Sequence, residues 1–170
     1  MSGILLSEYE IMLNPALGAN ALWAFTHGFV SENKKDLHSL SLWHLVTVLP
    51  LVYHEVTRKI IIKRRASSGL RSILERDSVS SISQNEVIFN INSRLKSMEN
   101  RTFRSINLAI LCDLIKVQDG YFLPNRPFKI PTNTPNETME ILKASKKLGG
   151  WAGNMSEFEY LTILGVKPIQ

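Results

Sequence analysis

Apolar residues recur at helical spacing from the first part of the chain onward. Asn14-Pro15 is a typical helix start, because an asparagine side chain caps free N–H groups and a proline at the first helical position sacrifices no hydrogen bond. The pattern predicts a helix over about 15–28, ending near Gly28. Its apolar stripe consists of Leu17, Ala21, Leu22, Phe25 and Phe29.

The next apolar segment, 40–49, is hydrophobic on nearly every side, which predicts a helix in the middle of the core. Pro50 cannot donate a hydrogen bond to the preceding turn, so we expect the helix to kink or restart there. A short helix over about 57–63 follows and carries several cations. Ser67 and Ser68 are candidate caps for a helix near 69–76.

Residues 83–124 predict two helices and a hairpin. Ser83 and Glu86 have the spacing of a capping box, and the helix that they open is followed by another over about 101–113. Asp119-Gly120 is a strong two-residue hairpin signal, because both turn positions favour positive φ. Together with the helix near 69–76, these elements form the outline of a winged helix-turn-helix.

The last part of the chain returns to helices. A proline- and asparagine-rich loop over 125–138 leads into a helix at about 137–148, which Gly149-Gly150 is expected to end. Ser156 caps a last helix, and Gly165 with Pro168 ends it. The predicted fold is therefore mainly α: one domain over 1–170, with a winged-helix-like part at about 83–124 and the N- and C-terminal helices packed around it.

Composition narrows the class of protein. The chain has 170 residues, a formal net charge of +5 and one cysteine, Cys112, which we expect to be buried on the apolar side of a helix. Excess positive charge favours an acidic partner, either nucleic acid or an acidic protein face. No apolar run reaches the roughly 20 residues of a membrane span. We therefore expect a cytoplasmic protein that does not contact a membrane.

The sequence contains no phosphate-binding loop, no nucleophile motif and no metal-ligand spacing. His44 and His54 fall in the apolar segment and are expected to be hydrogen-bonded core or interface residues. We accordingly predict no enzyme activity, no catalytic residue, no cofactor and no metal.

A cluster of cations without an intervening acid stands out between the second apolar segment and residue 71. It is either the solvated end of a helix or a surface that contacts phosphates or an acidic protein face. The cluster consists of Arg58, Lys59, Lys63, Arg64, Arg65 and Arg71. Arg101 and Arg104, at the start of the predicted third helix, and Lys116, in the hairpin, are further candidates.

Three segments together resemble a known family. They are NPALGANALWAF (14–25), LWHLVTVLPLVYHEVTR (42–58) and LGGWAGNMSEFEYLTILGVKP (148–168). In this order and spacing the chain resembles the middle component of bacterial three-component ABC systems, a group that includes the Lamassu antiviral systems. The residues that carry the resemblance are Asn14, Pro15, Trp23, Leu49, Pro50, Thr57, Arg58, Trp151, Leu164, Gly165 and Val166.

The resemblance implies a defence complex against phages or plasmids. Its partners would be an SMC-like ABC ATPase that senses DNA and an effector, often a nuclease, with double-stranded DNA in the same complex. The middle component would be a non-catalytic adaptor that links the two proteins. An adaptor needs two surfaces, and the candidates are the region 83–124 and the N-terminal helix with the segment 151–166. Trp151 is either a core residue or an anchor for a partner, since its small neighbours, residues 152–154, would leave the ring partly uncovered.

A second interpretation remains open. The hairpin and the cations also suit a winged-helix DNA-binding regulator that acts alone, although this leaves the first part of the chain without a role.

Overall fold

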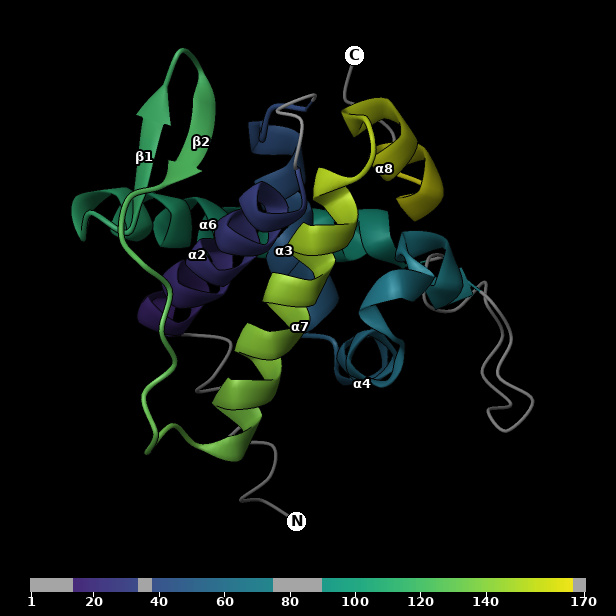
Figure 1. Cartoon of the computed structure of the whole chain (residues 1–170), viewed down its shortest axis with the longest axis horizontal. Helices are drawn as coiled ribbons and strands as arrows, with labels where there is room; N and C mark the ends of the chain where they lie inside the picture. Colours follow the sequence, from purple (N-terminus) through teal and green to yellow (C-terminus); the bar gives the residue numbers. More distant parts are fainter. Residues whose placement is uncertain (1–13, 34–37, 75–89, 167–170) are drawn as a thin grey trace.

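The computed structural model of the chain describes residues 14–33, 38–74 and 90–166. In these ranges the protein is mainly helical with one antiparallel hairpin, which confirms the predicted fold class (Figure 1). The elements in chain order are α2 (Pro15–Glu32), α3 (Leu42–Val52), α4 (Glu55–Lys63), the short 3-10 helices η1 (Ala66–Ser68) and η2 (Leu70–Leu74), α6 (Ile91–Leu111), β1 (Ile115–Gln118), β2 (Tyr121–Pro124), α7 (Asn136–Gly153) and α8 (Glu157–Leu164).

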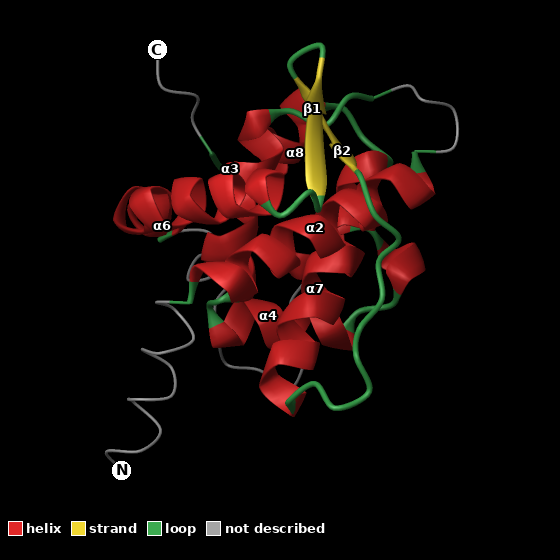
Figure 2. Cartoon of the chain, turned by 90° about the vertical axis from the view of Figure 1, so that its left-hand side faces the viewer, coloured by secondary structure: helices red, strands yellow, loops and turns green. Residues whose placement is uncertain are grey.

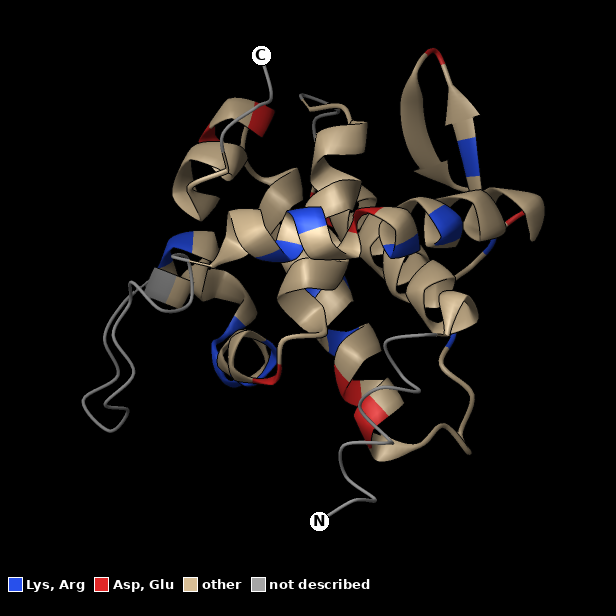
Figure 3. Ribbon diagram, turned by 180° about the vertical axis from the view of Figure 1, so that it is seen from behind, with Lys and Arg blue, Asp and Glu red and all other residues tan. Residues whose placement is uncertain are grey.

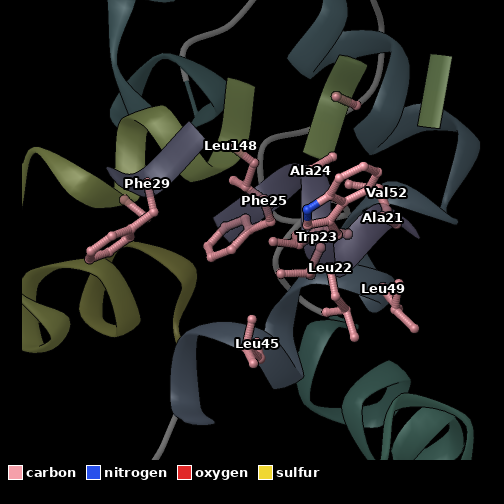
Figure 4. Close-up of a cluster of buried hydrophobic side chains, with 14 of the residues drawn as sticks. Ala21, Leu22, Trp23, Ala24, Phe25, Phe29, Leu45, Leu49, Val52 and Leu148 are labelled. Atoms are coloured by element: carbon pink, nitrogen blue, oxygen red, sulfur yellow. The ribbon is translucent and has the colours of Figure 1, made fainter. Parts of the chain in front are cut away.

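Helix α2 lies at the centre of the helical body, where it contacts α7, α6, α3 and β2 (Figure 1). Its start is as predicted, since Asn14 Oδ1 accepts hydrogen bonds from the N–H groups of Ala16 and Leu17 at 2.9 and 3.4 Å. The helix runs on to Glu32, past the predicted end near residue 28. Its buried side chains meet those of α3 and α7 in the core, and Figure 4 labels Ala21, Leu22, Trp23, Ala24, Phe25 and Phe29 with Leu45, Leu49, Val52 and Leu148.

Helices α2 and α7 cross in direct backbone contact at glycines. A β carbon on Gly28 would lie 1.9 Å from the carbonyl oxygen of Lys146, and one on Gly149 would lie 2.0 Å from that of Phe25. The prediction that Gly149-Gly150 ends the helix is wrong, because α7 continues to Gly153. The glycines are needed for the close approach of the two helices, which a single-helix pattern does not reveal.

Helix α3 lies in the core, as its apolar sequence predicts. Pro50 falls inside the last turn of α3, and the chain breaks only at Tyr53 and His54, before α4 begins. The carbonyl of Pro50 accepts a hydrogen bond of 3.1 Å from Arg94 on α6. The helix predicted near 69–76 is the 3-10 helix η2. None of the helices in the three described ranges is long and apolar enough to cross a membrane.

Helix α6 corrects the prediction of two helices in this region. It is continuous from Ile91 to Leu111, so no turn precedes residue 101. The winged helix-turn-helix arrangement is therefore not confirmed, and the predicted start at Ser83 lies outside the described residues. The helix is continuous because one buried stripe crosses the expected break; it consists of Met98, Thr102, Ser105, Ile106 and Ala109.

The hairpin is formed as predicted. Asp119 and Gly120 have φ angles of 52° and 80°, as a two-residue turn of this kind requires. Ile115 at the base of the hairpin is buried, and so is Phe122, which pairs with Val117 nearer the turn. The N–H of Phe122 donates a 2.9 Å hydrogen bond to Leu40 O. Figure 2 shows the strands standing out from the helical body. The hairpin is thus anchored to the helical body through one buried side chain on each strand.

Helix α8 closes the core over the start of α3. Ser156 Oγ accepts a 3.2 Å hydrogen bond from the N–H of Glu159, and Gly165 ends the helix with a φ of 65°, which confirms both predicted boundaries. Pro168, which was also expected to end this helix, lies outside the described residues. Tyr160 is fully buried, and its hydroxyl lies 2.8 Å from Thr47 Oγ1 on α3.

Candidate partner-binding site

The predicted cation cluster is divided by the fold. On α4 and the turn after it, Lys59, Lys63 and Arg65 are exposed and Arg64 is half-buried, so this part of the cluster lies at the surface. Lys59 forms an ion pair with Glu55 one turn earlier, and this pair lowers the pKa of the Glu55 carboxyl. The cations also complement the negative end of the helix dipole.

Arg58 points inward, unlike its neighbours. Its side chain is only 6% exposed and lies 3.4 Å from Glu137 and 3.7 Å from Glu140 on α7. It also donates a 3.1 Å hydrogen bond to Val52 O. Arg58 therefore joins α3, α4 and α7 and presents no free guanidinium to a partner in this conformation.

Lys147, which was not among the predicted residues, fixes the position of the basic turn, residues 63–65 at the end of α4. Its ammonium donates hydrogen bonds of 2.8 Å to the carbonyls of Ile62 and Arg64. These carbonyls lie at the end of α4, where no further helical turn supplies a donor. Partial burial lowers the pKa of Lys147. The contact holds the basic turn against α7.

The remaining predicted cations lie on elements other than α4 and the turn after it. Arg71 on η2 is exposed and pairs with Glu159 on α8 at 3.0 Å. Arg101 and Arg104 lie in the middle of α6, and not at a helix start as predicted, while Lys116 lies on β1. Figure 3 shows the basic bands of α6 and the hairpin apart from those of α4. The structure thus separates the predicted residues into two basic regions.

Trp151 is a core residue in this conformation. It is 3% exposed, and its indole N–H donates a 2.7 Å hydrogen bond to Ala66 O. The expectation that small neighbours would leave the ring uncovered fails because α7 continues through them and buries it. Trp151 nevertheless lines one wall of a groove.

That groove has a volume of about 1230 Å³ and lies between α7, the end of α2, the turn after α4 and the segment 128–130. Four lysines line it, of which none was predicted: Lys129, Lys143, Lys146 and Lys147. On α7, Lys146 and Lys147 follow Lys143 by three and four residues, which is a signal that the sequence does contain. The segment 128–130 that faces them could not be placed from the sequence.

Ser41, His44 and Glu157 form the arrangement that most resembles a catalytic one. The hydroxyl of Ser41 contacts both the carboxylate of Glu157 and Nδ1 of His44, the latter at 3.1 Å. In a hydrolase the acid would instead orient the histidine through its second nitrogen. Here Nε2 of His44 is buried and has no hydrogen-bond partner among the described residues. The three side chains tie the start of α3 to α8.

The other reactive side chains give no sign of a catalytic centre. Cys112 is exposed at the end of α6, which corrects the prediction of a buried thiol. His54 caps α4, with Nδ1 2.8 Å from Thr57 Oγ1. Within the described part of the chain, no three His, Cys, Asp or Glu side chains are grouped to hold a metal ion.

In the described ranges the protein is thus a small helical protein with a projecting hairpin, two separate regions of predicted cations and a groove lined by lysines. The chain belongs to the ABC-three component (ABC-3C) system Middle Component 3 family, whose model matches residues 2–168. It is therefore a middle component of such a system, as the resemblance implied. A search of curated proteins and a search of solved structures gave no match.

Proposed function

We propose that this protein is the non-catalytic adaptor of a Lamassu-type defence complex, where it links an SMC-like, DNA-sensing ABC ATPase to an effector nuclease in the cytoplasm. The observation that carries this proposal is the family match over residues 2–168, which assigns nearly the whole chain to the middle component of a multi-protein system. Such a component acts through its contacts with the other members.

The hairpin and the end of α6 support a role in binding one of these proteins. Leu111 is 83% exposed, and Val117 and Tyr121 are about half exposed. One buried residue on each strand anchors the hairpin, so these apolar side chains are presented on a fixed support (Figure 1). Exposed aromatic and aliphatic residues on a projecting element are typical of protein interfaces.

Co-expression with the ATPase and the effector of the same system tests the adaptor function. We expect the ATPase and the effector to co-elute in size-exclusion chromatography only when the chain is present. The double variant Val117→Ser, Tyr121→Ser should lose one partner while its melting temperature stays near that of the wild type. Co-elution of the other two proteins without this chain would contradict the proposal.

The same preparation tests the alternative function. A stand-alone DNA-binding regulator would bind duplex DNA with the same affinity whether or not the ATPase and the effector are present. An adaptor would contact DNA chiefly within the assembled complex, since its partner is the DNA sensor.

A further inference from the structure

We propose that the groove beside α7 binds an acidic peptide segment of a partner protein. The carboxylates of that segment contact the lysine rim, formed by Lys129, Lys143 and Lys146, and an apolar side chain of the segment contacts the groove floor. The inference rests on the proposed adaptor function, for which it supplies a second surface away from the hairpin. It names the chemistry that a partner must offer there.

The rim of the groove is strongly basic. Lys143 and Lys146 are exposed on neighbouring turns of α7, and Lys129 is exposed on the facing segment. Glu32 is the one acidic residue among the side chains that line the groove. Cations on both sides of an open groove attract an anionic chain and hold it along the groove axis.

The floor of the groove is apolar. It is formed by half-buried side chains that pack on the core and still face the groove, namely Ile62, Ile130 and Met155. Binding is favoured when a partner side chain covers half-buried apolar surface, because that surface is then removed from water. The floor therefore favours a ligand that carries apolar side chains as well as charge.

The walls of the groove are formed before any ligand arrives. The ring of Phe128 packs edge-on against Trp23 with centroids 5.0 Å apart, and the indole of Trp23 donates a 3.1 Å hydrogen bond to Arg126 O. On the other side, Lys147 holds the turn after α4 against α7. Binding to a preformed groove requires little ordering of the protein, which favours affinity.

A protein segment fits this groove better than a nucleic acid. Single-stranded nucleic acid gains much of its binding free energy by stacking bases on exposed aromatic faces. Here the ammonium of Lys146 lies 5.5 Å from the centre of the Phe128 ring and covers its face, and Trp151 is buried. A phosphate backbone would also leave the apolar floor uncovered, whereas a peptide of acidic and apolar residues covers both parts.

The test uses the isolated chain and a fluorescein-labelled peptide that alternates glutamates with leucine and phenylalanine. Fluorescence anisotropy should show binding that weakens with salt, and the same peptide with glutamine in place of glutamate should bind at least about tenfold more weakly. Labelled duplex and single-stranded DNA are measured in parallel.

Variants that add or remove negative charge at the groove test the site, because the two kinds of change should have opposite effects on peptide binding. The triple variant Lys129→Glu, Lys143→Glu, Lys146→Glu should weaken peptide binding about tenfold or more, whereas arginine at the same positions should preserve it. Glu32→Gln should tighten binding, because it removes the acid that repels the ligand. The single reversal Lys143→Glu is compared with Lys96→Glu on α6, outside the groove lining, because both variants change the net charge by the same amount.

Three results would overturn the inference: no peptide binding, equal binding of the glutamine peptide, or peptide binding that the triple variant leaves unchanged. DNA binding that depends on the same lysines, without peptide binding, would assign the groove to nucleic acid and also overturn it. Peptide binding by a chain that fails to bridge the ATPase and the effector would instead contradict the adaptor function alone.

Discussion

His44 shows how one buried side chain makes the fold sensitive to pH. Its ring lies between Phe29 and Tyr160, with centroid distances of 5.3 and 5.1 Å. Burial lowers the pKa of His44 from 6.5 to about 4, although the Glu157 carboxylate acts in the opposite direction. The folded protein therefore holds this imidazole neutral at a pH where the unfolded chain would protonate it.

We expect acid to destabilise the protein through His44. Between about pH 6.5 and pH 4 the unfolded state binds a proton that the folded state does not, so stability is complete above this window and falls as the pH decreases through it. The loss attributable to His44 is about 3 kcal/mol at pH 4. Urea unfolding at several pH values should show a shallower dependence in His44→Gln than in the wild type. The same dependence in both proteins would refute this role.

Arg58 and Lys59 are adjacent in sequence but should behave differently when truncated. Arg58→Met removes a hydrogen bond to Val52 O and the contacts with Glu137 and Glu140, and we expect the free energy of unfolding to fall by about 2 kcal/mol. Lys59→Met removes only an exposed ion pair, worth about 0–1 kcal/mol. Chemical denaturation measures both changes. Equal stability of the two variants would show that Arg58 has no structural role.

At the scale of elements, the packing of α2 on α7 depends on which face of a helix each glycine occupies. Gly149 and Gly150 are neighbours in α7, yet a β carbon at Gly149 would meet the backbone of Phe25 at 2.0 Å. At Gly150 the nearest atom is the side-chain Cγ of Glu32 at 3.1 Å, which can move aside. The two positions form a matched pair.

We expect Gly149→Ala to lower the free energy of unfolding by about 1–3 kcal/mol, because two helices must separate to admit the methyl group. Gly150→Ala should be neutral or stabilising by up to about 1 kcal/mol, since alanine is the better helix former. Thermal unfolding of the two variants gives the comparison. If Gly149→Ala is as stable as Gly150→Ala, the helices are not in the close contact described here.

The elements with local signals were predictable from the sequence. Two helix caps, Asn14 and Ser156, and one hairpin turn, Asp119-Gly120, each depend only on residues within four positions. Both caps and the turn are present as predicted. The continuity of α6 was not predictable, because it depends on Thr102 and Ser105, polar residues that are buried in the tertiary structure.

In the candidate site too, local patterns could be recognised from the sequence, but contacts between distant segments could not. The cations of α4 could be recognised as a charged cluster, but the inward direction of Arg58 depends on Glu137 and Glu140, which are distant in sequence. The lysines of α7 were visible in the sequence as a spaced set. They form the rim of a groove only because the segment 128–130 lies opposite them. The position of this segment is fixed by a contact between Phe128 and Trp23.

At the scale of the whole molecule, the basic turn should affect association more than stability. Reversal of charge at Lys63, Arg64 and Arg65 to glutamate is expected to weaken binding to the complex or to DNA, most strongly at low salt. Surface ion pairs contribute only about 0–1 kcal/mol each, so the melting temperature should change little. Pull-downs with each partner and with duplex DNA, beside a melting curve, measure the effect.

The control for this variant keeps the charge, with Lys63→Arg, Arg64→Lys and Arg65→Lys together. Binding by the glutamate variant equal to that of the control at low salt would assign the turn to a solvated helix end.

The central position of α2 also has a consequence for the synthesis of the protein. Its main packing partner, α7, is encoded near the other end of the chain, and α6 lies between them in sequence. At ribosomal rates α2 leaves the exit tunnel on the order of ten seconds before α7 does. During that interval its apolar stripe lacks the partner that covers it. We therefore expect the nascent chain to acquire its stable fold only after α7 has left the exit tunnel, and chains truncated before α7 to depend on chaperones for solubility.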